Sequence, residues 1–251
     1  MIELEAKAFK PYVFTSKADR FWSPPFDVVT PEQEVELKKN SFNITHITLP
    51  RGQNGIKDSS LNFQKWLREG ILSQIKKDSI ILLVQEFNHH GSAMQRFGVI
   101  LLVRVNPDDG SIIPHEMTFS GPKKNRVDLM SGTGLVPEPI FLVVPDPELP
   151  KAVENITSTI DPSGKFEEPS GVINRYYILK DDNSIEKSVL YLHDIEYVKN
   201  MVESGKASCA VLMPDWDKDR FVKIVSSGKK LSQKSTFFYP KPPSGVAIYK
   251  P

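Results

Sequence analysis

Two segments that lie far apart in the sequence both combine cationic side chains with prolines or hydroxyl groups. The first is GPKKNR at 121–126, which places Lys123, Lys124 and Arg126 in the first turn of an expected helix. Cations at this end of a helix oppose its dipole. A negative group should compensate them, and either an anion bound at the free backbone N–H groups or a carboxylate of the same chain would do so.

The second segment is QKSTFFYPKPPSG at 233–245, near the end of the chain. Its lysines and hydroxyl groups are hydrogen-bond donors suited to a phosphate or a carboxylate. If the two segments meet in space, an anion between them explains why both are basic. The alternative is that the tail only clamps a C-terminal strand. On the first view, the ligand-binding residues are Thr118, Lys123, Arg126, Lys234, Ser235, Thr236 and Lys241.

His115 and Glu116 stand just before the first segment, with Thr118 close behind them. An imidazole and a carboxyl group that approach a helix N-terminus are suited to acid–base catalysis or to orienting a ligand. We therefore take His115 and Glu116 as candidate catalytic residues. A hydrogen-bonded structural cluster is the other interpretation, and whether the protein is an enzyme stays open.

No local pattern predicts a metal site or a cofactor. None of the five histidines forms a His-x-x-x-His pair or lies near a second cysteine, as zinc sites require. Residues 228–235 resemble a phosphate-binding P-loop, but Gln233 replaces its second glycine and FFYPKPPSG cannot begin a helix. DWDKDR at 215–220 begins like a calcium loop, but Arg220 stands where that loop needs glycine. We predict no metal site, and the cofactor is left unassigned.

Composition limits the class of partner. The 251 residues are 39% hydrophobic and 25% charged, which is typical of soluble globular proteins. The formal net charge of +1 argues against nucleic acid as a partner, although residues 218–251 carry eight basic side chains and one acidic one.

No apolar run approaches the roughly 20 residues of a membrane helix, and the single Cys209 cannot form an internal disulfide. We expect a cytoplasmic protein without membrane contact, and its oligomeric state stays open.

Hydrophobic periodicity and turn residues predict interleaved helices and strands. Helices are expected over 31–39, 58–70, 121–132, 147–157, 192–205 and 217–228. Strands are expected over 43–49, 79–87, 94–105, 139–144, 172–179 and 206–213, with a short strand before residue 30 and an extended end at 245–249. These elements predict an α+β fold, with a mixed sheet, a β-hairpin and flanking helices. We expect one domain over 1–251, with sub-lobes at 1–145 and 171–251 as the alternative division, joined by a proline- and acid-rich segment.

Local signals fix some of these boundaries. Thr30 and Gln33 have the capping-box spacing at the start of the first helix. Gly70 suits the position just after the second helix, whose expected apolar face carries Leu61, Trp66 and Leu67. The run NHHGSA at 88–93 is expected to turn one strand back on the next as a hairpin.

Four stretches resemble a bacterial and archaeal family of uncharacterised conserved proteins, defined by a domain of unknown function. They are PPFDVVTPEQ (24–33), NITHITLPRG (43–52), IIPHEMTFSGPKKNR (112–126) and KSTFFYPKPPSG (234–245). WLREGIL (66–72) and RFGVILLVRV (96–105) fit the same pattern, so the resemblance covers most of the chain. It implies that the tail closes the domain on itself. Its path would be fixed by Pro240, Pro242 and Pro243, and it would be anchored in the core by Phe237, Phe238 and Tyr239.

Longer members of that family resemble the ParB-like superfamily, which includes nucleotide-using proteins and free-serine kinases. The kinship rests on an Asp-Gly-His-His-Arg box that this sequence lacks, since His89-His90-Gly91 lies on the earlier hairpin. Our hypothesis is therefore that the protein binds a small phosphorylated or carboxylated ligand in a cleft between the GPKKNR turn and the KSTFFYPK tail. A phosphoryl-transfer enzyme related to free-serine kinases and a non-catalytic nucleic-acid-binding relative are the alternatives.

Overall fold

The computed structural model describes residues 6–15, 19–105, 112–113, 120–143, 148–180, 207–213, 226–227 and 239–251. The helices in these ranges are η1 (Asp19–Phe21), α1 (Pro31–Lys38), α2 (Thr45–Thr48), α3 (Gly55–Arg68), α4 (Ser120–Thr133) and α5 (Glu148–Thr157). The strands are β1 (Ala6–Lys7), β2 (Tyr12–Phe14), β3 (Leu72–Gln74), β4 (Ser79–His89), β5 (Ser92–Arg104), β6 (Ile140–Val143), β7 (Gly164–Glu167), β8 (Ile173–Lys180) and β9 (Ala207–Met213).

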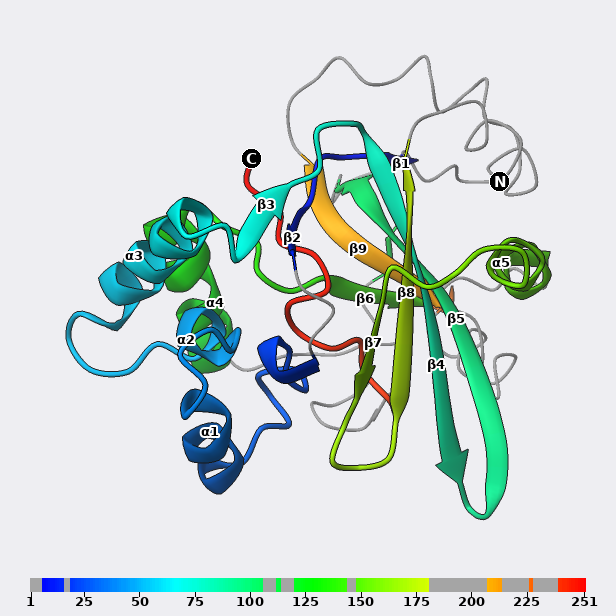
Figure 1. The fold of residues 1–251 in the computed structure, drawn as a ribbon, viewed down its shortest axis with the longest axis horizontal. Coiled ribbons are helices and arrows are strands. Elements are labelled where there is room, and N and C mark those ends of the chain that lie inside the picture. The colour runs from blue at the N-terminus through cyan, green and yellow to red at the C-terminus, as the bar shows by residue number, and fades with distance from the viewer. Residues whose placement is uncertain are drawn as a thin grey trace.

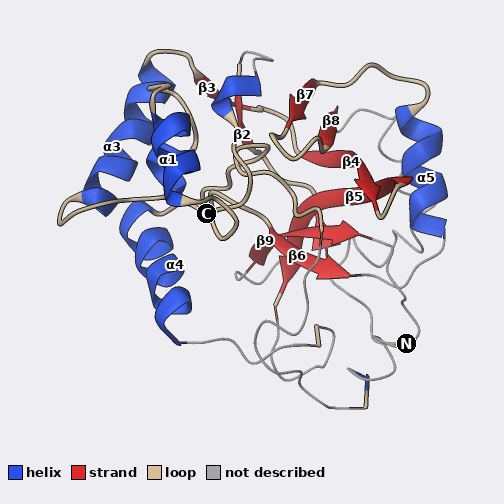
Figure 2. Ribbon diagram, turned by 90° about the horizontal axis from the view of Figure 1, so that it is seen from below, coloured by secondary structure: helices blue, strands red, loops and turns tan. Residues whose placement is uncertain are grey.

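One sheet of seven strands organises the described part of the chain (Figure 1). Its order is β6-β9-β5-β4-β8-β7, with β1 also paired to β5, while β2 and β3 form a separate small sheet. β6 and β9 are parallel, and the other neighbours described are antiparallel. Helices α1, α3 and α4 lie on one side of the sheet and α5 lies on the other (Figure 2). The predicted α+β fold, with a mixed sheet and flanking helices, is confirmed.

The central strand β4 is buried on both faces, because alternate residues of a strand point to opposite sides. Ile81 and Leu83 point into the larger core, which also contains Trp66 of α3. Ile80 and Leu82 point into a second core, which contains the apolar side chains of α5. The continuous apolar run of β4 is therefore explained by one layer of helices on each side.

Capping and turn residues act as the sequence predicts. Thr30 Oγ1 accepts a hydrogen bond from the backbone N–H of Gln33 at 3.2 Å, and the backbone N–H of Thr30 donates to Gln33 Oε1 at 2.9 Å. Gly70 follows α3 with φ of 69°. His90 and Gly91 both have positive φ at the β4–β5 turn, as a two-residue hairpin with this twist requires.

The strand predicted over 43–49 is wrong, because this segment contains the short helix α2. The buried Asn43 side chain decides the conformation: its Oδ1 accepts from Thr45 N at 3.0 Å and from Thr45 Oγ1 at 2.7 Å. Such local side-chain bonds compete with a strand ladder. Ile44 and Ile47, three residues apart, then both enter the core. Their spacing of three residues fits one face of a helix, whereas in a strand the two side chains would point to opposite faces.

Other differences are smaller. Leu61 is 55% exposed, so the buried face of α3 is carried by Ser59, Phe63 and Trp66 instead. Strand β7 lies in the proline- and acid-rich segment, where no strand is predicted, and residues 26–28 form a turn without a strand. The helix predicted over 192–205 lies outside the described residues, as does that over 217–228 except for 226–227.

The end of the chain is folded into the core. Ser244 pairs with Ser23, Ile248 with Tyr12 and Tyr249 with Val136, each through backbone hydrogen bonds. Residues 242–248 are all buried. The described part of the tail therefore closes the domain on itself by connecting three segments that are distant in the sequence.

Candidate ligand-binding site

A row of polar side chains crosses three neighbouring strands beneath the tail. Asn174 of β8 is paired with Gln85 of β4, and Gln85 is paired with Arg96 of β5, so all three lie on one face of the sheet. Each is at most 6% exposed. Gln85 Nε2 donates to Asn174 Oδ1 at 2.7 Å. Buried polar groups need partners, and this row finds further partners in the backbone of the tail.

The polar row binds three consecutive carbonyl groups of the tail. Arg96 donates from Nη2 to the carbonyl of Tyr239 and from Nη1 to that of Pro240. Gln85 Nε2 also donates to the carbonyl of Lys241 at 3.0 Å. The Tyr239 ring meets the Phe87 ring edge-on, with 5.8 Å between centroids. These contacts fix where the tail enters the core and place the Lys241 side chain.

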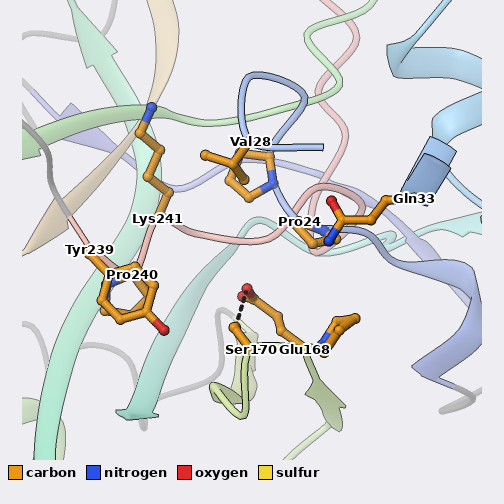
Figure 3. A pocket seen from close by; sticks show the side chains of 10 residues that line it. Pro24, Val28, Gln33, Glu168, Ser170, Tyr239, Pro240 and Lys241 are labelled. Carbon is orange, nitrogen blue, oxygen red and sulfur yellow. Dashed lines mark hydrogen bonds between the residues drawn. The ribbon is translucent and has the colours of Figure 1, made fainter. Parts of the chain in front are cut away.

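A hollow of about 160 Å³ lies beside this part of the tail (Figure 3). Its walls combine apolar rings and carbon stems with a few polar groups, a composition that is typical of small-molecule sites. The lining residues come from the loop before α1, from α1, from the turn after β7 and from the tail: Pro24, Pro25, Val28, Gln33, Glu168, Pro169, Ser170, Tyr239, Pro240 and Lys241.

Glu168 supplies the carboxyl group of the hollow. Asn174 Nδ2 donates to its Oε1 at 3.0 Å, and Ser170 Oγ donates to its Oε2 at 3.3 Å. Burial raises the pKa of Glu168, while these two hydrogen bonds act in the opposite direction. The polar row that holds the tail therefore continues through Asn174 to an acid at the hollow.

Lys241 supplies the cation. Its ammonium group forms an ion pair with Asp27, which lies in the loop before α1. Figure 3 shows the side chain running along one side of the hollow, with the ammonium group directed away from Glu168. The two charged groups of the hollow are therefore separated, and Lys241 is partly compensated by Asp27.

Arg126 contacts the same loop one residue earlier. Its guanidinium group lies over the Phe26 ring, with 4.0 Å between Cζ and the ring centroid. Nη1 donates to the carbonyl of Thr48 at 2.8 Å and lies 3.5 Å from Glu138 Oε2. Glu138 Oε1 accepts hydrogen bonds from Ser244 Oγ and from the backbone N–H of Phe26. A carboxylate of the same chain thus compensates Arg126, which is one of the two arrangements that the sequence left open.

The structure brings two of the predicted ligand-binding residues to one loop. Arg126 and Lys241 contact the adjacent residues Phe26 and Asp27, but the lining of the hollow includes Lys241 and not Arg126. The Lys123 side chain is exposed on α4. The other predicted site residues lie outside the described residues: His115, Glu116, Thr118, Lys234, Ser235 and Thr236.

Sequence reasoning missed Glu168, Ser170 and Gln33 as lining residues. Gln33 had already been assigned to the capping box, a role that it keeps. Glu168 and Ser170 flank Pro169 in an acid-rich stretch without periodicity, so their types gave no signal. Their place becomes visible only because β7 and β8 pair and turn the 168–171 loop towards the tail.

The described ranges show neither a metal site nor a membrane-spanning helix. There, histidine, cysteine, aspartate and glutamate side chains do not gather in threes where a metal ion would bind. Nor does any helix in those ranges combine the length and the apolar character needed to cross a membrane.

Comparison with known proteins gives one result. Residues 7–198 match the model of a family described as protein of unknown function, DUF1015. Neither the curated proteins nor the solved structures gave a match. The family match spans most of the 251 residues and agrees with the resemblance seen in the sequence. The chain therefore belongs to the DUF1015 family, a domain family of unknown function.

Proposed function

We propose that the protein binds a small carboxylated or phosphorylated compound in the hollow beside the tail, with Lys241 as its cationic contact. The supporting observation is that Lys241 lines this hollow while the backbone around it is fixed by Gln85 and Arg96. An ammonium group has three N–H donors, and Asp27 accepts one of them. An acid that reaches Lys241 can therefore bind without displacing Asp27.

The size of the hollow restricts the ligand. Pockets for drug-sized molecules have volumes of about 300–1,000 Å³, whereas this hollow has about 160 Å³. A compound with few heavy atoms fits such a volume. Thr118, Lys234, Ser235 and Thr236 remain proposed as further contacts to the acid group. Arg126 is expected to contribute less, because Glu138 and Thr48 already occupy its Nη1.

A thermal shift experiment tests the proposal with inorganic phosphate and acetate as probes. A ligand that binds only the folded state raises its stability, and at saturation we expect the melting temperature to rise by about 2–5 °C. Lys241→Met should abolish this rise. Lys123→Met is the matched control, because it removes a lysine that is exposed on α4 and is not among the residues that line the hollow. Equal rises in all three proteins would show that the effect is not binding at Lys241.

Phosphoryl transfer is the alternative function, proposed because longer members of the family resemble ParB-like proteins and free-serine kinases, although this chain lacks their Asp-Gly-His-His-Arg box. His115 or Glu116 would then act as the base, and the nearby lysines and Arg126 would stabilise phosphate charge. Turnover of ATP or ADP with magnesium and free serine tests this alternative. Activity that depends on His115 or Glu116 would replace the binding proposal with an enzymatic one.

A further inference from the structure

Glu168 is a buried acid that faces a hollow. It is 8% exposed, and both of its described side-chain partners, Ser170 and Asn174, are neutral. Within the described ranges, none of its interactions is with a lysine, arginine or histidine. The cation that shares the hollow, Lys241, pairs with Asp27 and is directed away from Glu168.

Such a carboxyl group is in an unfavourable environment when it is ionised. A buried charge is normally paired or coordinated, and burial without a cation shifts a carboxyl group towards its neutral form. The raised pKa of Glu168 agrees with this. A cation that enters the hollow would supply the missing charge.

We propose that Glu168 forms a subsite for a small organic cation, namely a primary ammonium group on a compound with few heavy atoms. Each carboxylate oxygen has lone pairs beyond the one used by Ser170 or Asn174, so an ammonium group can donate to either oxygen. The carbon part of the compound would pack against the proline rings of the walls: Pro24, Pro25, Pro169 and Pro240. A divalent metal ion is a poorer fit, because calcium takes six to eight oxygen ligands and, among the described residues of the lining, Glu168 is the only acid.

This subsite shares the hollow with the proposed acid site but does not depend on it. A simple amine without an acid group should bind at Glu168 even if phosphate and acetate fail to bind at Lys241. A compound that carries both groups would engage both ends of the hollow.

A titration with ethylammonium chloride tests the subsite, and binding is monitored through the backbone amide chemical shifts in NMR spectra. Ethanol is the neutral probe of similar size. We expect saturable amide shifts at Glu168, Ser170 and Gly171 of the wild-type protein with ethylammonium and none with ethanol. Glu168→Gln should weaken ethylammonium binding at least tenfold. Glu167→Gln is the matched control, because Glu167 is the exposed neighbour on β7, and it should bind like the wild type.

The Lys241→Met protein separates the two proposals, because it should lose acid binding and keep ethylammonium binding. The subsite is refuted if the wild-type protein shows no saturable shift, or if Glu168→Gln binds as tightly as the wild type. If Glu168→Gln does not fold, Ser170→Ala decides the question. It frees Oε2 of Glu168 from one donor, so ethylammonium should bind more tightly, and unchanged or weaker binding would contradict the subsite.

Discussion

Gln85 and Arg96 are direct cross-strand neighbours, and both donate hydrogen bonds to backbone carbonyls of the tail. Two adjacent strands thus hold residues 239–241 through their main chain. Because these hydrogen bonds are to backbone carbonyls, they fix the path of the tail without involving the Lys241 side chain. The position of the proposed acid site therefore depends on a polar row that takes no part in binding itself.

Arg96→Met should destabilise the protein strongly. The substitution leaves two carbonyls, those of Tyr239 and Pro240, without these donors, and each unsatisfied buried group costs about 1–3 kcal/mol. We expect the free energy of unfolding to fall by about 2–4 kcal/mol in urea denaturation. Arg68→Met, on the exposed end of α3, should change it by less than about 0.5 kcal/mol. Similar losses in both variants would show that Arg96 does not anchor the tail.

Gly245→Ala tests the packing of the tail motif. Gly245 has φ of 95°, and an added Cβ would lie 3.0 Å from Trp22 Cδ1 and 3.2 Å from Phe14 Cε2. Gly91→Ala is the matched control, because Gly91 has φ of 81° and open space around that position. Positive φ alone should cost about 1–2 kcal/mol in both variants. Gly245→Ala should lose about 1–3 kcal/mol more through overpacking, and an equal loss in the two variants would contradict tight packing at Gly245.

Arg126 and Glu138 should be strongly coupled. Glu138→Gln removes the carboxylate that compensates Arg126, and the unpaired guanidinium should cost about 3 kcal/mol of stability. Arg126→Met should be similarly harmful on its own. The double variant should be much less destabilised than the sum of the two, because neither charge is then left alone. Additive losses in this double-mutant cycle would show that Arg126 is not compensated by Glu138.

Glu34 should contribute to stability in a pH-dependent way. Hydrogen bonds and charge from Arg51 and Lys38 lower the pKa of Glu34 from 4.5 to about 2. Because the folded-state pKa lies below the unfolded-state value, the contribution is present above about pH 4.5 and is lost as the pH falls towards 2. Glu34→Gln should destabilise the protein by about 1 kcal/mol at pH 7 and by progressively less below pH 4.5. A deficit that stays constant from pH 7 to pH 3 would contradict this account.

Local signals in the sequence predicted most of the described elements. The capping box of α1, the hairpin turn at His90 and Gly91, and the apolar runs of β4 and β5 each specify their conformation within a few residues. Residues 43–49 were mispredicted because their isoleucines and threonines are β-branched types that favour a strand, although the two isoleucines are three residues apart, as on one face of a helix. The hydrogen bond from the backbone N–H of Thr45 to Asn43 Oδ1 decides between helix and strand, and the sequence pattern does not reveal it.

The candidate site could be predicted only in part. From the sequence, Arg126 and Lys241 were expected to need a negatively charged partner. The sequence could not identify Glu138 and Asp27 as those partners, because they come from segments that only the fold brings near. The same holds for Glu168, which the β7–β8 pairing carries to the tail.

The affinity of the Asp27→Asn protein for inorganic phosphate tests the central claim most directly. Asp27 neutralises part of the positive charge of the Lys241 ammonium group, and one charge–charge interaction near the surface is worth about 0.2–1 kcal/mol. Removing the Asp27 carboxylate should therefore tighten phosphate binding by a factor of about 1.4 to 5, as measured by calorimetric titration. In the Asp27→Asn, Lys241→Met double variant the gain should disappear. Unchanged or weaker binding by Asp27→Asn would contradict the assignment of Lys241 as the ligand's cationic contact.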